Sequence, residues 1–263
     1  MRYLEAGQGR PLVLLHAFPL SGDMWRPQLA SLPPGWRGIA PDLRGFGGSS
    51  RDVTDGEHLV AAPARGMDDY ARDVLALLTH LGIDRFVVVG LSMGGYVTFA
   101  LWRLAALRLV GALLADTRSD ADSEQVTAGR EQMLQRLDSE GPRGIADVMV
   151  PRLLGASTRA HRPDVVAQVR RIIEATRPPA IADAIRGLMA RPDSTAQLAS
   201  MAMPVHLVAG REDELTPVAL HEQMQARMPG ATLTVIEGAG HLSNVEQPEA
   251  FTHALSAFLS RLS

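Results

Sequence analysis

Short apolar runs alternate with segments of helical spacing along most of the chain, and this alternation limits the folds open to it. Buried strands are predicted at residues 11–17, 39–42, 85–90, 109–115, 204–210 and 232–236. Helices are predicted at residues 68–81, 93–104, 217–228 and 248–262. Strands that alternate with helices build a parallel sheet with helices on both faces, so the sequence predicts an α/β fold.

One long stretch interrupts the alternation. Residues 117–201 contain no convincing strand but carry amphipathic helical patterns, for example at 165–175. We therefore expect two parts. Residues 1–116 and 202–263 form the α/β core, and residues 117–201 form a helical cap, or lid, inserted before the last two strands. Residues 51–66 contain proline and glycine and are expected to form a long loop.

Composition excludes several classes of chemistry. All 26 basic residues are arginine, and cysteine is absent. Cysteine nucleophiles, thiolate metal sites, Schiff-base lysines and the lysine of a phosphate-binding loop are therefore excluded. The histidines and carboxylates do not cluster at metal-ligand spacing, and no dinucleotide-binding fingerprint is present. We expect no metal and no cofactor.

Charge and hydropathy also bear on partners and location. The net charge of −3 argues against a nucleic-acid partner. No apolar run approaches the ~20 residues that cross a bilayer, and the N-terminus lacks the pattern of a signal peptide. A cytoplasmic protein with a small-molecule substrate and no membrane partner is expected.

The pentapeptide Gly90-Leu-Ser-Met-Gly94 follows a predicted buried strand and opens a predicted helix. A serine that projects from so tight a turn needs small residues two positions before and after it, and Gly90 and Gly94 meet that need. Ser92 is therefore the predicted nucleophile. A serine hydroxyl is a weak nucleophile, so it needs a neighbouring base, itself oriented by an acid.

His241 is the predicted base. It lies in a glycine-rich loop, residues 238–248, between the last predicted strand and the last predicted helix. Glycines there allow the sharp backbone path that points an imidazole inward. The other downstream histidines fall on helices, on a strand or at polar positions and are interpreted as core or surface residues.

Asp213 is the predicted acid, because it occupies the loop after the strand at 204–210. Asp116 competes with it, since the strand at 109–115 ends beside the same site. The neighbours Glu212 and Glu214 are expected to be solvated. Thr216, at the end of this loop, is expected to be the N-cap of the next helix.

An oxyanion intermediate also needs two backbone N–H donors. One is predicted at Met93, which follows the nucleophile, and the other at Phe18, in the loop after the first buried strand. His16 is interpreted as a structural hydrogen-bonding residue that holds this loop.

Five motifs in this order resemble those of the α/β-hydrolase superfamily, over essentially the whole chain. They are His16-Ala-Phe-Pro-Leu20, Asp42-Leu-Arg-Gly-Phe-Gly-Gly-Ser49, Gly90-Leu-Ser-Met-Gly94, Gly210-Arg-Glu-Asp-Glu-Leu-Thr-Pro217 and Gly240-His241. Two departures matter. The family usually has His-Gly where this chain has His16-Ala17, and a Cβ there restricts the backbone that presents the oxyanion donor. Too few residues precede Pro11 for the family's eight strands, so the sheet is expected to be trimmed at that edge.

The resemblance implies a serine hydrolase similar to small carboxylesterases and enol-lactonases with a helical cap. Related dehalogenases and epoxide hydrolases use an aspartate where this chain has Ser92, and related hydroxynitrile lyases need a cap lysine. A carboxylesterase for small to medium esters is the first hypothesis. A lactonase of the enol-lactone or acyl-homoserine lactone type is the alternative. Perhydrolysis by the same triad is a third hypothesis, and a non-catalytic binding protein is the competing class. The cap methionines Met133, Met149 and Met189 either line the pocket or pack the cap on the core.

Overall fold

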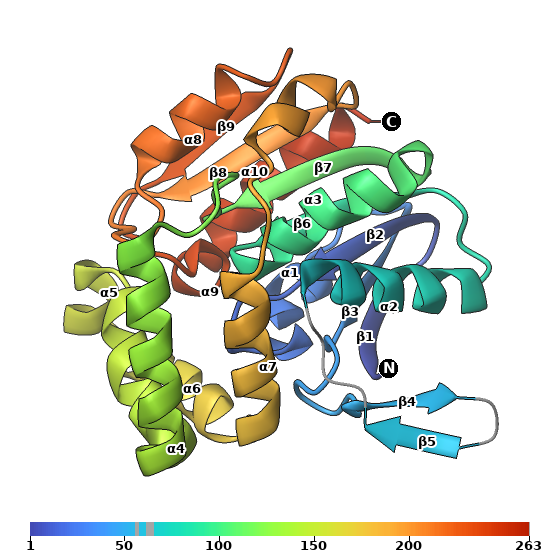
Figure 1. Ribbon diagram of the computed structural model, residues 1–263. Coiled ribbons are helices and arrows are strands. Elements are labelled where there is room, and N and C mark those ends of the chain that lie inside the picture. Colours follow the sequence, from blue (N-terminus) through green and yellow to red (C-terminus); the bar gives the residue numbers. More distant parts are fainter. Residues whose placement is uncertain (56–57, 62–65, 263) are drawn as a thin grey trace.

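A seven-stranded sheet runs through the centre of the protein (Figure 1). The structure is a computed structural model and describes residues 1–55, 58–61 and 66–262. In sheet order the strands are β1 (Tyr3–Gly7), β3 (Trp36–Pro41), β2 (Arg10–Leu15), β6 (Phe86–Leu91), β7 (Leu109–Ala115), β8 (Val205–Gly210) and β9 (Thr232–Ile236). All neighbours pair in parallel except β1, which runs antiparallel to β3. The predicted α/β fold is confirmed.

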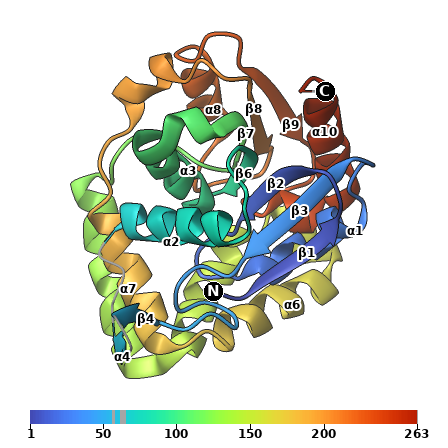
Figure 2. The same cartoon turned by 90° about the vertical axis from the view of Figure 1, so that its right-hand side faces the viewer.

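Helices cover both faces of this sheet, as Figure 2 shows. Helices α2, α3 and α8 lie on one face, and α1 and α10 lie on the other. Their bounds are α1 (Arg26–Ala30), α2 (Met67–His80), α3 (Met93–Ala105), α8 (Val218–Gln225), α9 (Ser243–Glu246) and α10 (Pro248–Ser260), with short 3₁₀ turns η1 (Gly22–Trp25) and η2 (Ala106–Arg108). The central strand β6 is buried along its whole length, which explains its unbroken run of apolar side chains.

Two predictions about local structure were incomplete or wrong. The prediction missed β1, and the sheet of the described residues has seven strands, in agreement with the expected trimming. Within residues 51–66, expected to be a loop, the structure has an antiparallel hairpin of β4 (Asp52–Asp55) and β5 (His58–Ala61). Residues 56–57 and 62–65 of that stretch lie outside the described residues.

The segment between β7 and β8 is helical. The structure describes all of residues 117–201, and they contain no strand. It forms α4 (Glu124–Leu153), α5 (Ala156–His161), α6 (Pro163–Glu174), α7 (Pro178–Met189) and the 3₁₀ turn η3 (Thr195–Ser200). Figure 1 shows α4 to α7 grouped together, apart from the helices that flank the sheet. Helix α4 is interrupted at Gly141, whose φ of 65° is non-helical. No helix of the described residues is long and apolar enough to span a membrane.

The two ends of this helical segment are joined to each other. The backbone N–H of Ser194 donates to the carbonyl oxygen of Ser119 at 2.8 Å. The hydroxyls of Ser119 and Thr195 lie 3.0 Å apart. We call this junction the neck. The chain therefore leaves the sheet after β7 and returns toward β8 through a hydrogen-bonded junction.

The turn between β6 and α3 is a tight junction of strand and helix. A Cβ on Gly94 would collide with the backbone carbonyl of Leu15 in β2, and a Cβ on Gly90 would collide with the backbone carbonyl of Gly94. Both neighbours are backbone atoms of the central sheet or of α3, so neither can swing aside. The two glycines are therefore required by packing, as the pentapeptide predicts.

Gly94→Ala is expected to lower the free energy of unfolding by about 3 kcal/mol, because the new methyl group must push α3 away from β2. Gly129→Ala is the matched control. Gly129 is exposed within α4 and an added Cβ meets no atom, so this change should stabilise by about 0.5–1 kcal/mol. Denaturant unfolding of both variants measures the difference, and equal stabilities would contradict the steric account.

Candidate active site

Ser92 stands on the turn between β6 and α3 in a backbone conformation that non-glycine residues rarely adopt. Its φ is 55° and its ψ is −113°. Its N–H donates to the carbonyl of Ala115 at the end of β7, 2.9 Å away. Strain of this kind persists only where the surroundings fix it, and it concentrates at functional sites. The turn holds the Ser92 hydroxyl at the wall of a cavity, among the residues that line it.

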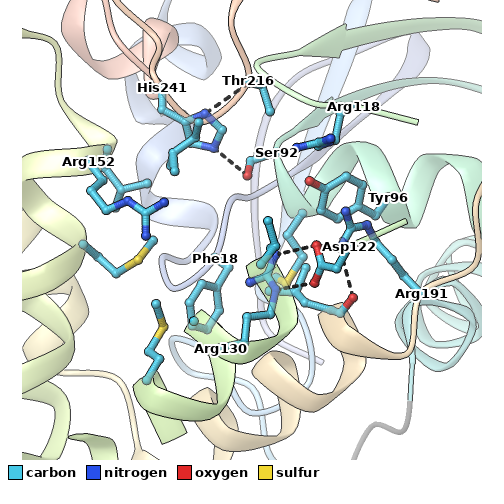
Figure 3. A pocket seen from close by; sticks show the side chains of 18 of the residues that line it. Phe18, Ser92, Tyr96, Arg118, Asp122, Arg130, Arg152, Arg191, Thr216 and His241 are labelled. Carbon is cyan, nitrogen blue, oxygen red and sulfur yellow. Dashed lines mark hydrogen bonds and ion pairs between the residues drawn. The ribbon is translucent and has the colours of Figure 1, made fainter. Parts of the chain in front are cut away.

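His241 joins Ser92 to Asp213, and Figure 3 shows its ring beside the serine. The His241 Nε2 atom lies 2.7 Å from the Ser92 hydroxyl oxygen. The His241 Nδ1 atom lies 2.7 Å from Asp213 Oδ2. The structure thus brings together the predicted nucleophile, base and acid. When Nδ1 carries the proton toward Asp213, Nε2 is free to accept the serine proton.

Thr216 belongs to this site and is not the helix N-cap that the sequence suggested. Helix α8 begins at Val218, and no side chain caps it. The Thr216 hydroxyl instead donates to Asp213 Oδ2 at 2.6 Å, and its backbone N–H donates to Asp213 Oδ1 at 3.0 Å. The N–H of Leu215 adds a bond of 2.8 Å to the same oxygen. Asp213 outcompetes the helix end for Thr216, and these three donors fix its carboxylate.

Electrostatics keep Asp213 ionised and stabilise the positive charge that His241 takes up with a proton. Burial alone would raise the pKa of Asp213, but the charge and hydrogen bond of His241 outweigh it and lower the pKa to about 2. Burial alone would lower the pKa of His241, but the Asp213 carboxylate outweighs it and raises that pKa above its ordinary value of 6.5. The carboxylate therefore stays ionised and favours the imidazolium.

Asp116, the competing acid, makes no hydrogen bond to His241. Its carboxylate accepts from the N–H of Gly210 at 2.8 Å and from the hydroxyl of Ser243 at 2.5 Å. Burial and the nearby charge of Asp213 raise its pKa to about 8. Asp116 thus connects the end of β8, which precedes the Asp213 loop, to the start of α9, which follows His241.

Glu246 is a buried carboxylate that sequence reasoning did not single out. It accepts from the N–H of Gly240 at 3.0 Å and of Leu242 at 3.1 Å, the two neighbours of His241. Its other oxygen accepts from the N–H of Gly155, just before α5, at 2.8 Å. Burial raises its pKa against the effect of these amides. Glu246 therefore binds the His241 loop to the helical segment.

Glu212 makes a second connection of this kind, next to Asp213. It was expected to be solvated, but it is half-buried and accepts from the N–H of Ser157 at 2.8 Å and from the Ser157 hydroxyl. A carboxylate at the first turn of α5 is favourable, because the first N–H groups of a helix lack partners within it. Glu214, by contrast, is exposed, as predicted.

The two predicted oxyanion donors, Phe18 and Met93, both line the cavity. Among the hydrogen bonds of the described residues, neither backbone N–H has an acceptor. The Cβ of Ala17 is accommodated, since Ala17 is buried at negative φ and its N–H approaches the Met24 sulfur at 3.3 Å.

His16 holds the same loop, as the sequence suggested. Its Nδ1 lies 2.9 Å from the carbonyl of Ala17, and its Nε2 accepts from the N–H of Leu43 at 3.0 Å. Burial lowers its pKa to about 4, so the ring is neutral and serves as a structural bridge.

The cavity in front of Ser92 measures about 440 Å³ and is bounded by both the sheet edge and the helical segment. Met133 and Met149 of α4 line it, whereas Met189 does not and packs against the core instead. Four arginines also line it: Arg118, Arg130, Arg152 and Arg191. A chamber of this size suits a small ligand with apolar and anionic parts.

Comparison with known proteins now places the chain in a family. The family model described as alpha/beta hydrolase fold matches residues 10–248. The chain therefore belongs to the α/β-hydrolase family, as the five motifs suggested.

Its relatives include two kinds of hydrolase. The 3-oxoadipate enol-lactonase 2 of Acinetobacter baylyi is 30% identical over an alignment that covers 99% of this chain and 93% of the relative. A solved structure of a thermophilic esterase from Thermogutta terrifontis, with malate bound, is 38% identical with a TM-score of 0.91 and covers 99% of this chain and 93% of that one. The solved structure of the enol-lactonase from Burkholderia xenovorans is 27% identical with a TM-score of 0.86. It covers 98% of this chain and 96% of that one.

Glu246→Gln is expected to lower the free energy of unfolding by about 2 kcal/mol, because a side-chain amide turns an N–H toward backbone N–H donors that need an acceptor. Hydrogen exchange should accelerate most where the new NH2 group faces a backbone N–H, either at Gly155 or at Gly240 and Leu242, because the one carbonyl oxygen of glutamine can serve only the other side. Glu131→Gln, at an exposed position within α4, is the matched control and should leave both readouts unchanged. Unchanged exchange at all three amides would contradict the connection between the two segments.

Proposed function

We propose that this protein is a serine hydrolase that cleaves small to medium carboxylic esters through an acyl-serine intermediate. The observation that carries the proposal is the pair of 2.7 Å contacts that link Ser92, His241 and Asp213 at the wall of a cavity. A merely structural role would not require an imidazole to lie against the hydroxyl of a serine whose backbone is strained.

The reaction follows from these positions. As Ser92 Oγ attacks the ester carbonyl, His241 Nε2 takes the hydroxyl proton, and Asp213 stabilises the imidazolium. The N–H groups of Phe18 and Met93 donate to the oxyanion of the tetrahedral intermediate. His241 then gives the proton to the departing alcohol. Water attacks the acyl-serine by the same route in reverse, which releases the acid and restores Ser92.

We further propose that residues 117–201 act as the cap of a core made of residues 1–116 and 202–263. The cavity wall supports this division, because α4 supplies Met133 and Met149 opposite the turn that carries Ser92. A chamber closed on that side favours small substrates over polymers.

A lactonase is the second candidate, and the enol-lactonase relatives favour it. A lactone is a cyclic ester, so the same nucleophile, base and oxyanion donors would open it. Only the shape of the cavity and the groups that bind the leaving alcohol distinguish the two activities.

Ser92→Ala is expected to abolish hydrolysis of short p-nitrophenyl esters, because no other group takes over the attack. Ser139→Ala, which removes an exposed hydroxyl on α4, is the matched control and should retain full activity. Equal rates in the wild type and Ser92→Ala would contradict the role of Ser92. No turnover of any ester or lactone would contradict the proposal and leave the non-catalytic binding protein.

A substrate panel then separates the two candidates. Aliphatic and aryl esters are compared with enol lactones and acyl-homoserine lactones by kcat/KM. The expected result is a preference for esters, whereas a preference for lactones would replace the first candidate with the second.

Asp213→Asn is expected to lower kcat/KM by roughly 10³-fold or more and to move its pH dependence. His241 must be neutral to accept the serine proton, so wild-type activity should fall as the pH drops through a pKa above 6.5. Without the Asp213 charge, burial dominates and the His241 pKa falls, so this decline should shift to lower pH. Near-normal turnover of Asp213→Asn would transfer the role to Asp116.

A further inference from the structure

The charge of the cavity wall is unbalanced. Four guanidinium groups line it, against the two carboxylates of Asp122 and Glu214. The molecule as a whole has a net charge of −3, so this local excess of positive charge runs against its average. Which of the four is available to a ligand depends on what each already binds.

Three of these arginines form ion pairs within the protein. Arg118 forms a bidentate pair with Asp120. Arg130 and Arg191 share Asp122, each at 2.5 Å from one of its oxygens. Arg191 is buried and also lies 4.3 Å from the centre of the Tyr96 ring. These three guanidinium groups are held by protein contacts, as Figure 3 shows for the pairs at Asp122.

The carboxylate of Asp122 is ionised in this arrangement. Burial would raise its pKa, but the hydrogen bond and charge of Arg130, together with the charge of Arg191, outweigh burial and lower it. Asp122 thus carries one negative charge between two positive ones. The wall on this side of the cavity remains attractive to an anion.

Arg152 differs from the other three. It is exposed near the end of α4, and within the described residues its guanidinium has no hydrogen bond or ion pair. Figure 3 shows its side chain directed into the cavity, on the opposite side from Asp122. Glu214, the remaining acidic group of the lining, is also exposed and forms no ion pair with it. Arg152 therefore presents an unused planar set of N–H donors to whatever fills the cavity.

We propose that the substrate of this cavity is an ester or lactone that carries a carboxylate, and that Arg152 is the residue that selects it. This inference rests on the proposed function and names the substrate class of the same site. The fork of a guanidinium matches a carboxylate, which it can bind through two parallel hydrogen bonds. One unpaired guanidinium balances one negative charge. The apolar lining from Met133, Met149 and Leu153 then accommodates the rest of a small substrate.

The test compares the hydrolysis of two matched pairs of esters, which is measured by titrating the acid that each reaction releases. Monoethyl adipate against ethyl hexanoate places the charge on the acyl side of the ester. Acetoxyacetate against propyl acetate places it on the alcohol side. For the wild type, kcat/KM should favour the charged member of one pair, which also shows the side that faces Arg152. Added salt should weaken that preference, because Arg152 is exposed to solvent.

Arg152→Gln is expected to lower the ratio of charged to neutral kcat/KM in that pair by about tenfold. Arg143→Gln is the matched control, because Arg143 is an exposed arginine of the same helix that does not line the cavity. It removes the same charge from the molecule and should leave the ratio unchanged. Unfolding midpoints of both variants confirm that the fold is retained.

The outcomes separate this inference from the proposed function. Neutral members preferred in both pairs, or an equal loss of ratio in Arg152→Gln and Arg143→Gln, would overturn the inference while the hydrolase stands. An absence of hydrolysis for all four esters and for the p-nitrophenyl esters would overturn the proposed function, and the inference with it.

Discussion

The contact between α3 and the central sheet determines where Ser92 stands. Gly94 lies against the carbonyl of Leu15 so closely that a methyl group cannot fit between them. The chain can reach α3 from β6 only through the sharp turn at Ser92, whose φ of 55° would be costly elsewhere. Packing of the helix on the sheet stabilises this strain. The position of the reactive hydroxyl is therefore a property of the sheet and not of a flexible loop.

The carboxyl ends of parallel strands explain why the rest of the site assembles around that hydroxyl. Ser92 follows β6, Asp213 follows β8 and His241 follows β9, so three distant stretches of chain meet at one edge. Asp116, after β7, lies among them and bonds both to Gly210 and to Ser243. It holds together the loops that carry Asp213 and His241 without a hydrogen bond to His241.

Local signals explain how much of this was readable from the sequence. Buried strands and the residues that directly follow them depend on short-range pattern, so the sheet, Ser92, Asp213 and His241 could be predicted. The strand β1 was missed because it is only partly buried and lacks an apolar run. Glu246 was missed because its role depends on Gly155, which lies 91 positions away and is brought near by folding. Thr216 was assigned to the helix end because the local pattern does not show that Asp213 takes its hydroxyl.

The neck has a consequence for how the length of this chain can change. Because Ser119 and Ser194 are hydrogen-bonded to each other, the residues between them form an insertion whose two ends lie side by side. A change of length inside such an insertion costs little loop-closure entropy, and it does not change the register between β7 and β8. The helices from α4 to α7 furnish one wall of the cavity, so a change among them alters the shape of the cavity. Glu212 and Glu246 tie these helices to the loops that carry Asp213 and His241, so those two contacts must be kept.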